Sequence, residues 1–224
     1  MPILSLVYAL LWLPISPAQV NTADDSACVD ANGQAQIDAC NRVIRSARWR
    51  GSDLAWAYGN RGGAYLGLER HDEAIADFDR SLELNESPNV LDNRGLAHIR
   101  KAEYRDAIRD FNRSLQIRPR GAFALHRRGM AYGLLEEYER AMTDLNAALR
   151  IDDRDSELWN NRGFVLLRLR RYEEAIQDFS QAIQLAPREP LAYANRGEAK
   201  LQLGDIAGAD ADYARHQQLV DSQR

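Results

Sequence analysis

The sequence predicts an all-α protein, a right-handed superhelical solenoid of about five helix-turn-helix repeats preceded by an N-terminal helical hairpin. Three observations support this prediction: a motif that recurs about every 34 residues, two amphipathic stripes within each period, and a glycine and an alanine at fixed places in it. A single pair of short helices buries too little apolar surface to be stable alone, so neighbouring repeats are expected to stack.

The recurrence is clearest in a tripeptide that ends in Arg-Gly. Its copies begin at Asn60, Asn93, Arg127, Asn161 and Asn195, with spacings of 33, 34, 34 and 34 residues. Twelve residues after each glycine stands an alanine: Ala74, Ala107, Ala141, Ala175 and Ala209. Four residues further on comes a large side chain: Phe78, Phe111, Leu145, Phe179 and Tyr213. A period sustained through five copies indicates a tandem array.

Each period contains two helical stripes. Within residues 55–88, Tyr58, Tyr65 and Leu68 lie on one stripe, and the polar run 69–72 follows it. The second stripe consists of Ala74, Ile75, Phe78 and Leu82. This pattern predicts two short helices joined by a polar turn. The recurring glycine and alanine mark the place where the two helices approach too closely for a larger side chain.

The pattern resembles the tetratricopeptide repeat, a 34-residue helical hairpin with an aromatic residue at position 4, glycine at 8, alanine at 20, an aromatic at 24 and proline near 32. The units expected from the resemblance are 55–87, 88–121, 122–155, 156–189 and 190–222, so that it covers residues 55–222. Position 4 holds Tyr58, Leu91, Leu125, Trp159 and Tyr193, and Pro119 and Pro187 occupy position 32. The Asn-Arg-Gly signature and the N-terminal segment described below suggest an exported bacterial type of this family.

Every unit carries an arginine at position 7 and an aspartate at position 23. The pairs are Arg61 with Asp77, Arg94 with Asp110, Arg128 with Asp144, Arg162 with Asp178, and Arg196 with Asp212. In an antiparallel hairpin these positions lie at nearly equal height, which predicts a structural ion pair across each hairpin. The alternative, a row of arginines that binds phosphate or RNA, is disfavoured because partnered arginines present little free charge.

The last unit differs from the others at two positions of its second helix. Positions 21 and 28 are apolar in the first four units, but they become Asp210 and Gln217 in the fifth. This change predicts a solvated terminal cap of the kind that ends a repeat array.

The N-terminal segment predicts export. Residues 1–23 contain no charged side chain, and prolines limit the apolar run to about ten residues, too short to span a bilayer but suitable for a signal-peptide core. We therefore expect a signal peptide at 1–18, cleavage before Gln19, and a periplasmic or secreted protein without stable membrane insertion after cleavage. No Lys or Arg precedes the apolar core, so an unprocessed anchor or a misplaced start codon stays open.

Export would make a disulfide the expected state of Cys28 and Cys40, the two cysteines of the chain. Twelve residues of continuous helix would separate them by about 18 Å, so a turn must intervene, and Asn32-Gly33 provides one. Residues 19–54 are therefore predicted to form a cysteine-containing helical cap on the first repeat. Two buried thiols are the alternative.

Composition and motifs argue against several function classes. The net charge of -4 gives no global attraction to nucleic acid. The four histidines fall at different repeat positions, so no metal site or cofactor is expected. No motif typical of nucleophilic, metal-dependent or phosphate-binding catalysis occurs, and no catalytic residue is predicted.

The resemblance implies that first-helix positions 2, 5, 6, 9, 12 and 13 line a concave groove that receives peptides. Four asparagines at position 6 are candidates to hold a peptide backbone, although a role in the scaffold is equally open: Asn60, Asn93, Asn161 and Asn195. Positions that vary between units offer aromatic and cationic candidates, for which solvated surface is the alternative: Arg100, Phe123, His126, Arg127, Met130, Asn160, Phe164 and Arg168.

Together these features predict a non-enzymatic scaffold or adaptor of the bacterial cell envelope that binds a protein or peptide partner and no nucleic acid. Arg127 and Arg168 are expected to pair with acidic groups of the partner, and substitution of Arg127 by glutamate is expected to weaken binding without unfolding. A homo-oligomeric structural array is the alternative, and a helical enzyme with an unrecognised site is a more distant one.

Overall fold

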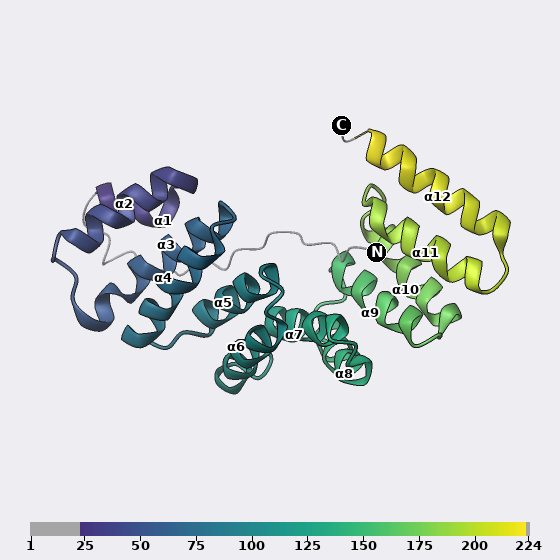
Figure 1. Cartoon of the computed structure of the whole chain (residues 1–224), viewed down its shortest axis with the longest axis horizontal. Helices are drawn as coiled ribbons and strands as arrows, with labels where there is room; N and C mark the ends of the chain where they lie inside the picture. Colours follow the sequence, from purple (N-terminus) through teal and green to yellow (C-terminus); the bar gives the residue numbers. More distant parts are fainter. Residues whose placement is uncertain (1–22, 223–224) are drawn as a thin grey trace. The chain divides into compact units, whose positions relative to one another are not determined.

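The computed structural model describes residues 23–222, which form twelve α-helices, one short 3₁₀ helix at Gly51–Leu54 and no strand (Figure 1). The predicted signal peptide, 1–18, and residues 19–22 lie outside the described residues. The all-α class expected from the sequence is confirmed. Within residues 23–222 no helix is both long enough and apolar enough to cross a membrane.

The helices follow one another as antiparallel pairs. An N-terminal pair, α1 (Ala23–Asp30) and α2 (Gly33–Arg45), precedes the five repeats. The repeats are α3 (Ala55–Gly67) with α4 (His71–Leu84), α5 (Pro88–Arg100) with α6 (Tyr104–Ile117), α7 (Ala122–Leu134) with α8 (Tyr138–Leu149), α9 (Ser156–Arg168) with α10 (Tyr172–Leu185), and α11 (Pro190–Gln202) with α12 (Ile206–Asp221).

The described chain divides into two compact units within α7. The N-terminal unit runs to Ala124, and the C-terminal unit begins at Leu125. Each unit has its own buried core.

A left-handed residue ends the first helix of every repeat. Position 15 has a φ of 59 to 61° at Glu69, Ala102, Glu136 and Arg170, and of 81° at Gly204. The amide of the next residue donates to the carbonyl five residues earlier, over 2.8 to 3.0 Å in the five repeats. This arrangement is a Schellman motif, which satisfies the last carbonyls of a helix and reverses the chain. The polar run predicted as a turn therefore has the same conformation in all five repeats. The left-handed residue at position 15 is glycine in one repeat and carries a side chain in the other four.

The repeated glycine allows the two helices of a hairpin to touch. A Cβ atom added to Gly62 would lie 2.7 Å from the ring of Phe78, and one added to Gly163 would lie 2.8 Å from the ring of Phe179. Both phenylalanine side chains are completely buried. The close approach inferred from the glycine at position 8 is thus present.

Within each unit, successive hairpins pack into a common apolar cluster. In the N-terminal unit, Leu66, Ala74 and Phe78 of the first repeat pack with Val90 and Ala97 of the second. In the C-terminal unit, Leu167 and Phe179 pack with Ala199 of the following helix in the same way. Stacking of this kind explains why the period is maintained in the sequence.

The N-terminal hairpin is closed by a disulfide between Cys28 and Cys40, whose Cα atoms are 4.7 Å apart. Gly33 has a φ of 56° and begins α2 after the turn. Cys28, Cys40 and Val43 pack with Ala57 of the first repeat, so the hairpin covers the outer face of α3. The carboxylate of Asp25 is buried in this hairpin and accepts hydrogen bonds from Arg48 and from the indole nitrogen of Trp49.

The C-terminal hairpin is only partly the polar cap that the sequence predicts. Asp210 and Gln217 are exposed, as expected. Three apolar side chains of the same hairpin, Leu201, Ile206 and Tyr213, are also exposed. In earlier repeats the next helix covers the corresponding side chains, and within residues 23–222 no further helix follows α12.

Candidate functional site

The five predicted Arg–Asp pairs are all present, and each is bidentate. The Nη2–Oδ1 distances are 2.6 Å for Arg61–Asp77, 2.6 Å for Arg94–Asp110, 2.7 Å for Arg128–Asp144, 2.7 Å for Arg162–Asp178 and 2.7 Å for Arg196–Asp212. The Nε atom of each arginine donates to the second carboxylate oxygen. These hydrogen bonds raise the pKa of Arg61, Arg128 and Arg196.

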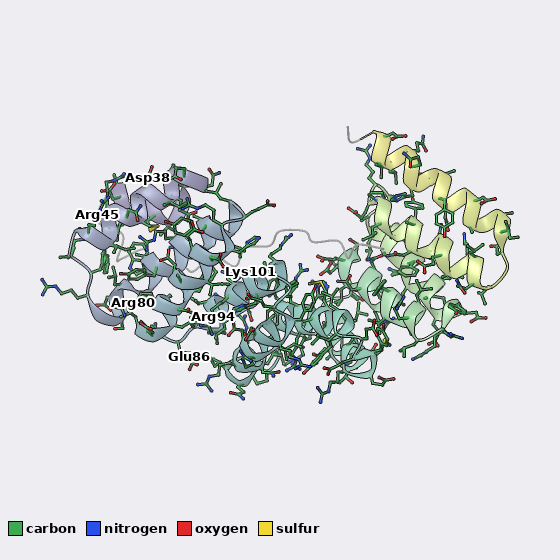
Figure 2. All side chains as sticks on the ribbon, viewed as in Figure 1. Asp38, Arg45, Arg80, Glu86, Arg94 and Lys101 are labelled. Atoms are coloured by element: carbon green, nitrogen blue, oxygen red, sulfur yellow. A yellow bond between two sulfur atoms is a disulfide. The ribbon has the colours of Figure 1, made fainter. Side chains whose placement is uncertain are left out.

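The same arginines also join neighbouring hairpins. The Nη1 atom of Arg94, which is labelled in Figure 2, lies 2.5 Å from Asp79 of the preceding repeat. Equivalent bonds run from Arg61 to Asn41 of α2 (2.5 Å), from Arg162 to Asn146 (2.9 Å) and from Arg196 to Ser180 (3.1 Å). Asn41 accepts from Arg61 in the way that Asp79, Asn146 and Ser180 accept from the arginine of the next repeat. The N-terminal hairpin therefore packs on the first repeat as one repeat packs on the next. These four guanidinium groups are therefore occupied by the scaffold.

Among the five paired aspartates, Asp212 has a second cation beside it, and its pKa shifts in the opposite direction from that of Asp178. Burial disfavours the ionised form of both Asp178 and Asp212. The pKa of Asp178 is raised, because one guanidinium does not offset its burial. The pKa of Asp212 is lowered, because Lys200 lies 2.8 Å from the carboxylate in addition to Arg196.

The predicted groove residues of the N-terminal unit are mostly enclosed by neighbouring helices. Asn60 and Asn93 are buried. Phe123 is half-buried and packs on the core shared by the first two repeats, and Arg100 is also half-buried. This unit therefore offers little of the predicted set to a partner.

In the C-terminal unit the prediction for Arg127 has to be corrected. Its side chain is only 4% exposed, and its two terminal nitrogens donate to the carboxylate of Glu157 over 2.6 and 3.0 Å. Arg127 cannot offer its guanidinium to an acidic partner while this pair is intact. Met130 is buried next to it.

The asparagines of this unit serve contacts between repeats. The side-chain amide nitrogen of Asn195 donates to Oδ1 of Asn160 over 3.0 Å, and that of Asn161 lies 2.8 Å from Nε2 of His126. All four side chains are buried. Nδ1 of His126 lies 3.3 Å from Asp155, whose side chain accepts from the first amides of α9. Burial opposes ionisation of Asp155, but the hydrogen bond from His126 leaves its pKa below the ordinary value. The scaffold role left open for these asparagines is therefore observed.

Arg168 is the predicted residue that remains exposed in this unit, and Phe164 beside it is half-buried. Arg168 borders a cavity of about 260 Å³ between the end of α9, the start of α10 and α11. The cavity is lined by Leu167, Arg168, Arg170, Tyr172, Glu198 and Gln202. Nε of Arg168 donates to the hydroxyl of Tyr138 over 3.2 Å, and this bond raises the pKa of Arg168.

Several residues of this cavity were not among the predicted site residues. Glu198 and Gln202 stand at positions 9 and 13 of the fifth repeat, which the family pattern places in the groove, so that pattern could have found them. Arg170 and Tyr172 belong to the turn and to the start of the second helix. No periodic signal of the sequence indicates that they reach the same cavity.

The structure also places His98 beside two carboxylates. Nδ1 of His98 lies 2.7 Å from Glu103, and one ligand atom each of His98, Glu103 and Asp106 lie within 4.8 Å of one another. A divalent metal could use such a set. Lys101 already pairs with Glu103 over 2.7 Å, and Arg109 pairs with Asp106. Since cations of the protein compensate both carboxylates, we interpret the set as an ion-pair cluster.

This geometry defines a class of protein: an array of stacked helical hairpins held by one repeated ion pair and one repeated glycine contact. Three of these hairpins match the tetratricopeptide repeat. Models of this family match residues 55–88, 124–155 and 156–189.

Solved structures share the fold at low sequence identity. MamA (residues 41 to the end) from Desulfovibrio magneticus RS-1 is 22% identical, with a TM-score of 0.68 over 75% of this chain and 96% of MamA. A tetratricopeptide repeat protein from Parabacteroides merdae ATCC 43184 is 21% identical, with a TM-score of 0.69 over 80% of this chain and 70% of that one. YrrB, described as a TPR protein with an unusual peptide-binding site, is 20% identical, with a TM-score of 0.63 over 82% of this chain and 93% of YrrB. No curated protein matches the sequence.

Proposed function

We propose that this protein is a non-enzymatic interaction scaffold whose C-terminal unit binds an acidic peptide segment at the Arg168 cavity. Tetratricopeptide repeats are typical of protein–protein interaction scaffolds, and the peptide-binding site named for YrrB supports a peptide as the ligand. The observation that carries the proposal is the exposed guanidinium of Arg168 at the edge of a cavity of about 260 Å³.

The lining of the cavity supports an acidic side chain followed by peptide backbone. Arg168 can donate two parallel hydrogen bonds to a carboxylate, and Gln202 can donate one more. Glu198 is an acceptor suited to a backbone amide of the same ligand. Leu167, which is buried, closes the apolar side of the cavity. The volume is close to the lower end of ordinary ligand pockets, so one or two peptide residues would fill it.

We also propose that the protein acts in the bacterial cell envelope. The apolar segment at 1–18 supports export, and the Cys28–Cys40 disulfide supports an oxidising compartment such as the periplasm. The peptide would then belong to another protein of the cell envelope.

Binding can be tested with peptides selected by phage display on the full chain. Affinity for a fluorescent copy of a selected acidic peptide is measured by anisotropy for the wild type, for Arg168→Ala and for Arg150→Ala. Arg150 is an exposed arginine at the end of α8 that does not line the cavity. Loss of a charge-assisted hydrogen bond should weaken binding by roughly 10- to 100-fold in Arg168→Ala.

The control variant Arg150→Ala should bind like the wild type. Equal affinity of the wild type and Arg168→Ala for every selected peptide would exclude this cavity as the binding site. A selection that enriches no acidic peptide would exclude the proposed ligand class.

A further inference from the structure

The Arg168 cavity is lined by two opposite charges that do not pair with each other. Arg168 lies at the end of α9, and Glu198 lies on α11, where its side chain is half-buried. Nε of Arg168 donates to the hydroxyl of Tyr138 in the preceding repeat. Among the residues that the structure describes, no cation pairs with Glu198. The scaffold therefore leaves this carboxylate free to bind a ligand.

A pair in the neighbouring repeats shows what these two residue types do when the scaffold uses both. Arg127 and Glu157 are 30 residues apart in the sequence, as Arg168 and Glu198 are, and they pair directly over 2.6 Å. In the cavity the arginine and the glutamate stay apart. The volume of about 260 Å³ that they line leaves room for a ligand that contacts both.

The charges around the cavity act on a ligand as well as on Arg168. The hydrogen bond with Tyr138 raises the pKa of Arg168, and the negative charges of Glu136 and Glu198 raise it further. A ligand that brings only a carboxylate to Arg168 is therefore repelled by Glu198. The exposed Arg170 on the cavity wall offsets part of this repulsion. A ligand that also brings a cation would compensate the charge of Glu198.

We propose that the cavity binds a dipolar peptide segment, in which a lysine or arginine stands next to the acidic residue. The acidic side chain accepts two parallel hydrogen bonds from Arg168, and the basic side chain donates to Glu198. Successive side chains of an extended segment point in opposite directions, so two neighbouring residues can reach the α9 and α11 walls of the cavity. This inference rests on the proposed function and narrows its ligand class.

The rest of the cavity wall suits a basic side chain beside an acidic one. Leu167 is buried and Tyr172 is half-buried, and both line the cavity. The aliphatic part of a lysine can pack on these two side chains while its charged end reaches Glu198. Repulsion by Glu198 acts against segments that carry only acidic residues. The cavity therefore selects for both charges rather than for negative charge alone.

Two capped peptides that differ at one residue test the role of Glu198. Phage display of short peptides with one fixed glutamate, carried out on the full chain, should enrich lysine or arginine beside that glutamate. The best peptide and a copy with alanine in place of its basic residue are then compared by fluorescence anisotropy. The wild type should bind the basic peptide roughly 10-fold more tightly than the alanine copy, as the loss of a charge-assisted hydrogen bond predicts.

The variant Glu198→Gln separates this role from a structural one. It should bind the two peptides with similar affinity, and it should bind the alanine copy more tightly than the wild type does, because the like-charge repulsion is gone. Damage to the fold would instead weaken the binding of both peptides. The matched control Glu173→Gln changes an exposed glutamate of α10 outside the cavity, and it should keep the roughly 10-fold ratio.

Arg168→Ala keeps this result distinct from the proposed function, and it should weaken the binding of both peptides. The dipolar ligand is overturned, and the acidic site stands, if Arg168→Ala weakens binding while the wild type binds the two peptides equally. A ratio that Glu198→Gln leaves unchanged, or a selection that enriches no basic neighbour, overturns it as well. If Arg168→Ala binds both peptides like the wild type, the proposed acidic site is wrong, and the inference falls with it.

Discussion

Arg127 illustrates how a buried partner changes the role of a residue. Its bidentate contact with Glu157 is enclosed, so that removal of one charge leaves the other without compensation. We predict that Arg127→Glu destabilises the fold by about 3 to 5 kcal/mol, since two buried carboxylates would then face each other. Urea denaturation measures the change. The sequence had suggested a folded variant with weaker binding, and the burial of the pair reverses that expectation.

An exposed pair provides the control for this prediction. Arg80, labelled in Figure 2, pairs with Glu83 on the surface of α4 over 2.7 Å. Arg80→Ala should leave the urea midpoint unchanged within error, because solvent screens such pairs. Similar urea midpoints for Arg127→Glu and Arg80→Ala would show that the buried pair does not contribute to stability.

Asp92 makes the stability of the protein sensitive to pH. Its side chain is completely buried on α5, and burial raises its pKa to about 6, although Arg118 lies 2.7 Å from one oxygen. Because the folded state binds this proton more tightly than the unfolded state does, the contribution of Asp92 to stability falls as the pH rises from about 4 to above 6. We predict that Asp92→Asn stabilises the protein at pH 7 by about 1 to 3 kcal/mol.

The measurement is the free energy of unfolding of wild type and Asp92→Asn at pH 5 and pH 7.5. The difference between the two proteins should be larger at pH 7.5, because the carboxylate is ionised there. Other groups titrate in both proteins and cancel in this comparison. A difference that grows toward pH 5 would contradict the raised pKa.

At the scale of an element, α3 contains a matched pair of glycines. A Cβ atom on Gly62 would meet the ring of Phe78 at 2.7 Å, while one on Gly63 would meet nothing within 4 Å. We predict that Gly62→Ala destabilises the fold by about 1 to 3 kcal/mol through overpacking. Gly63→Ala should stabilise it by about 0.5 to 1 kcal/mol, because alanine favours a helix interior. Thermal melts of the two variants measure both effects, and equal shifts would refute the close contact.

The helices themselves follow from local sequence. The polar run after each first helix predicted a turn, and the structure places that turn there with a left-handed residue at position 15. The left-handed conformation of this turn could not be predicted from residue type, because position 15 is not glycine in four of the five repeats. The hydrogen bonds at the helix end favour the left-handed conformation, although adopting it costs a residue with a side chain about 1 to 2 kcal/mol.

At the scale of the whole molecule, the position-7 arginines connect the hairpins. Arg94 joins Asp110 of its own repeat to Asp79 of the preceding one. We predict that Asp110→Ala costs about 3 to 5 kcal/mol, because Arg94 would lose its buried partner. Asp79→Ala removes only the exposed bond between repeats, so it should change stability by less than about 1 kcal/mol.

Hydrogen exchange followed by mass spectrometry tests this division. Asp110→Ala should raise exchange in both α5 and α6, since the bond inside the hairpin is lost. Asp79→Ala should leave exchange within that hairpin as in the wild type. Stronger exchange in Asp79→Ala than in Asp110→Ala would mean that the bond between repeats dominates.

The sequence by itself determined the repeat, its helices, the five ion pairs and the turn between the two cysteines. These features depend on contacts within a single hairpin, between residues that are 16 positions apart or fewer. All of them except the cysteine turn also recur in every repeat, so the period reveals them. The tertiary structure decided which first-helix side chains a partner can reach. Arg127 is enclosed by Glu157, 30 residues away, and Asn195 is enclosed by Asn160, 35 residues away. Whether a partner can reach such a residue depends on side chains of the neighbouring repeat, and the repeat period does not specify those side chains. For the same reason the cavity at Arg168 can be located only once the hairpins are stacked.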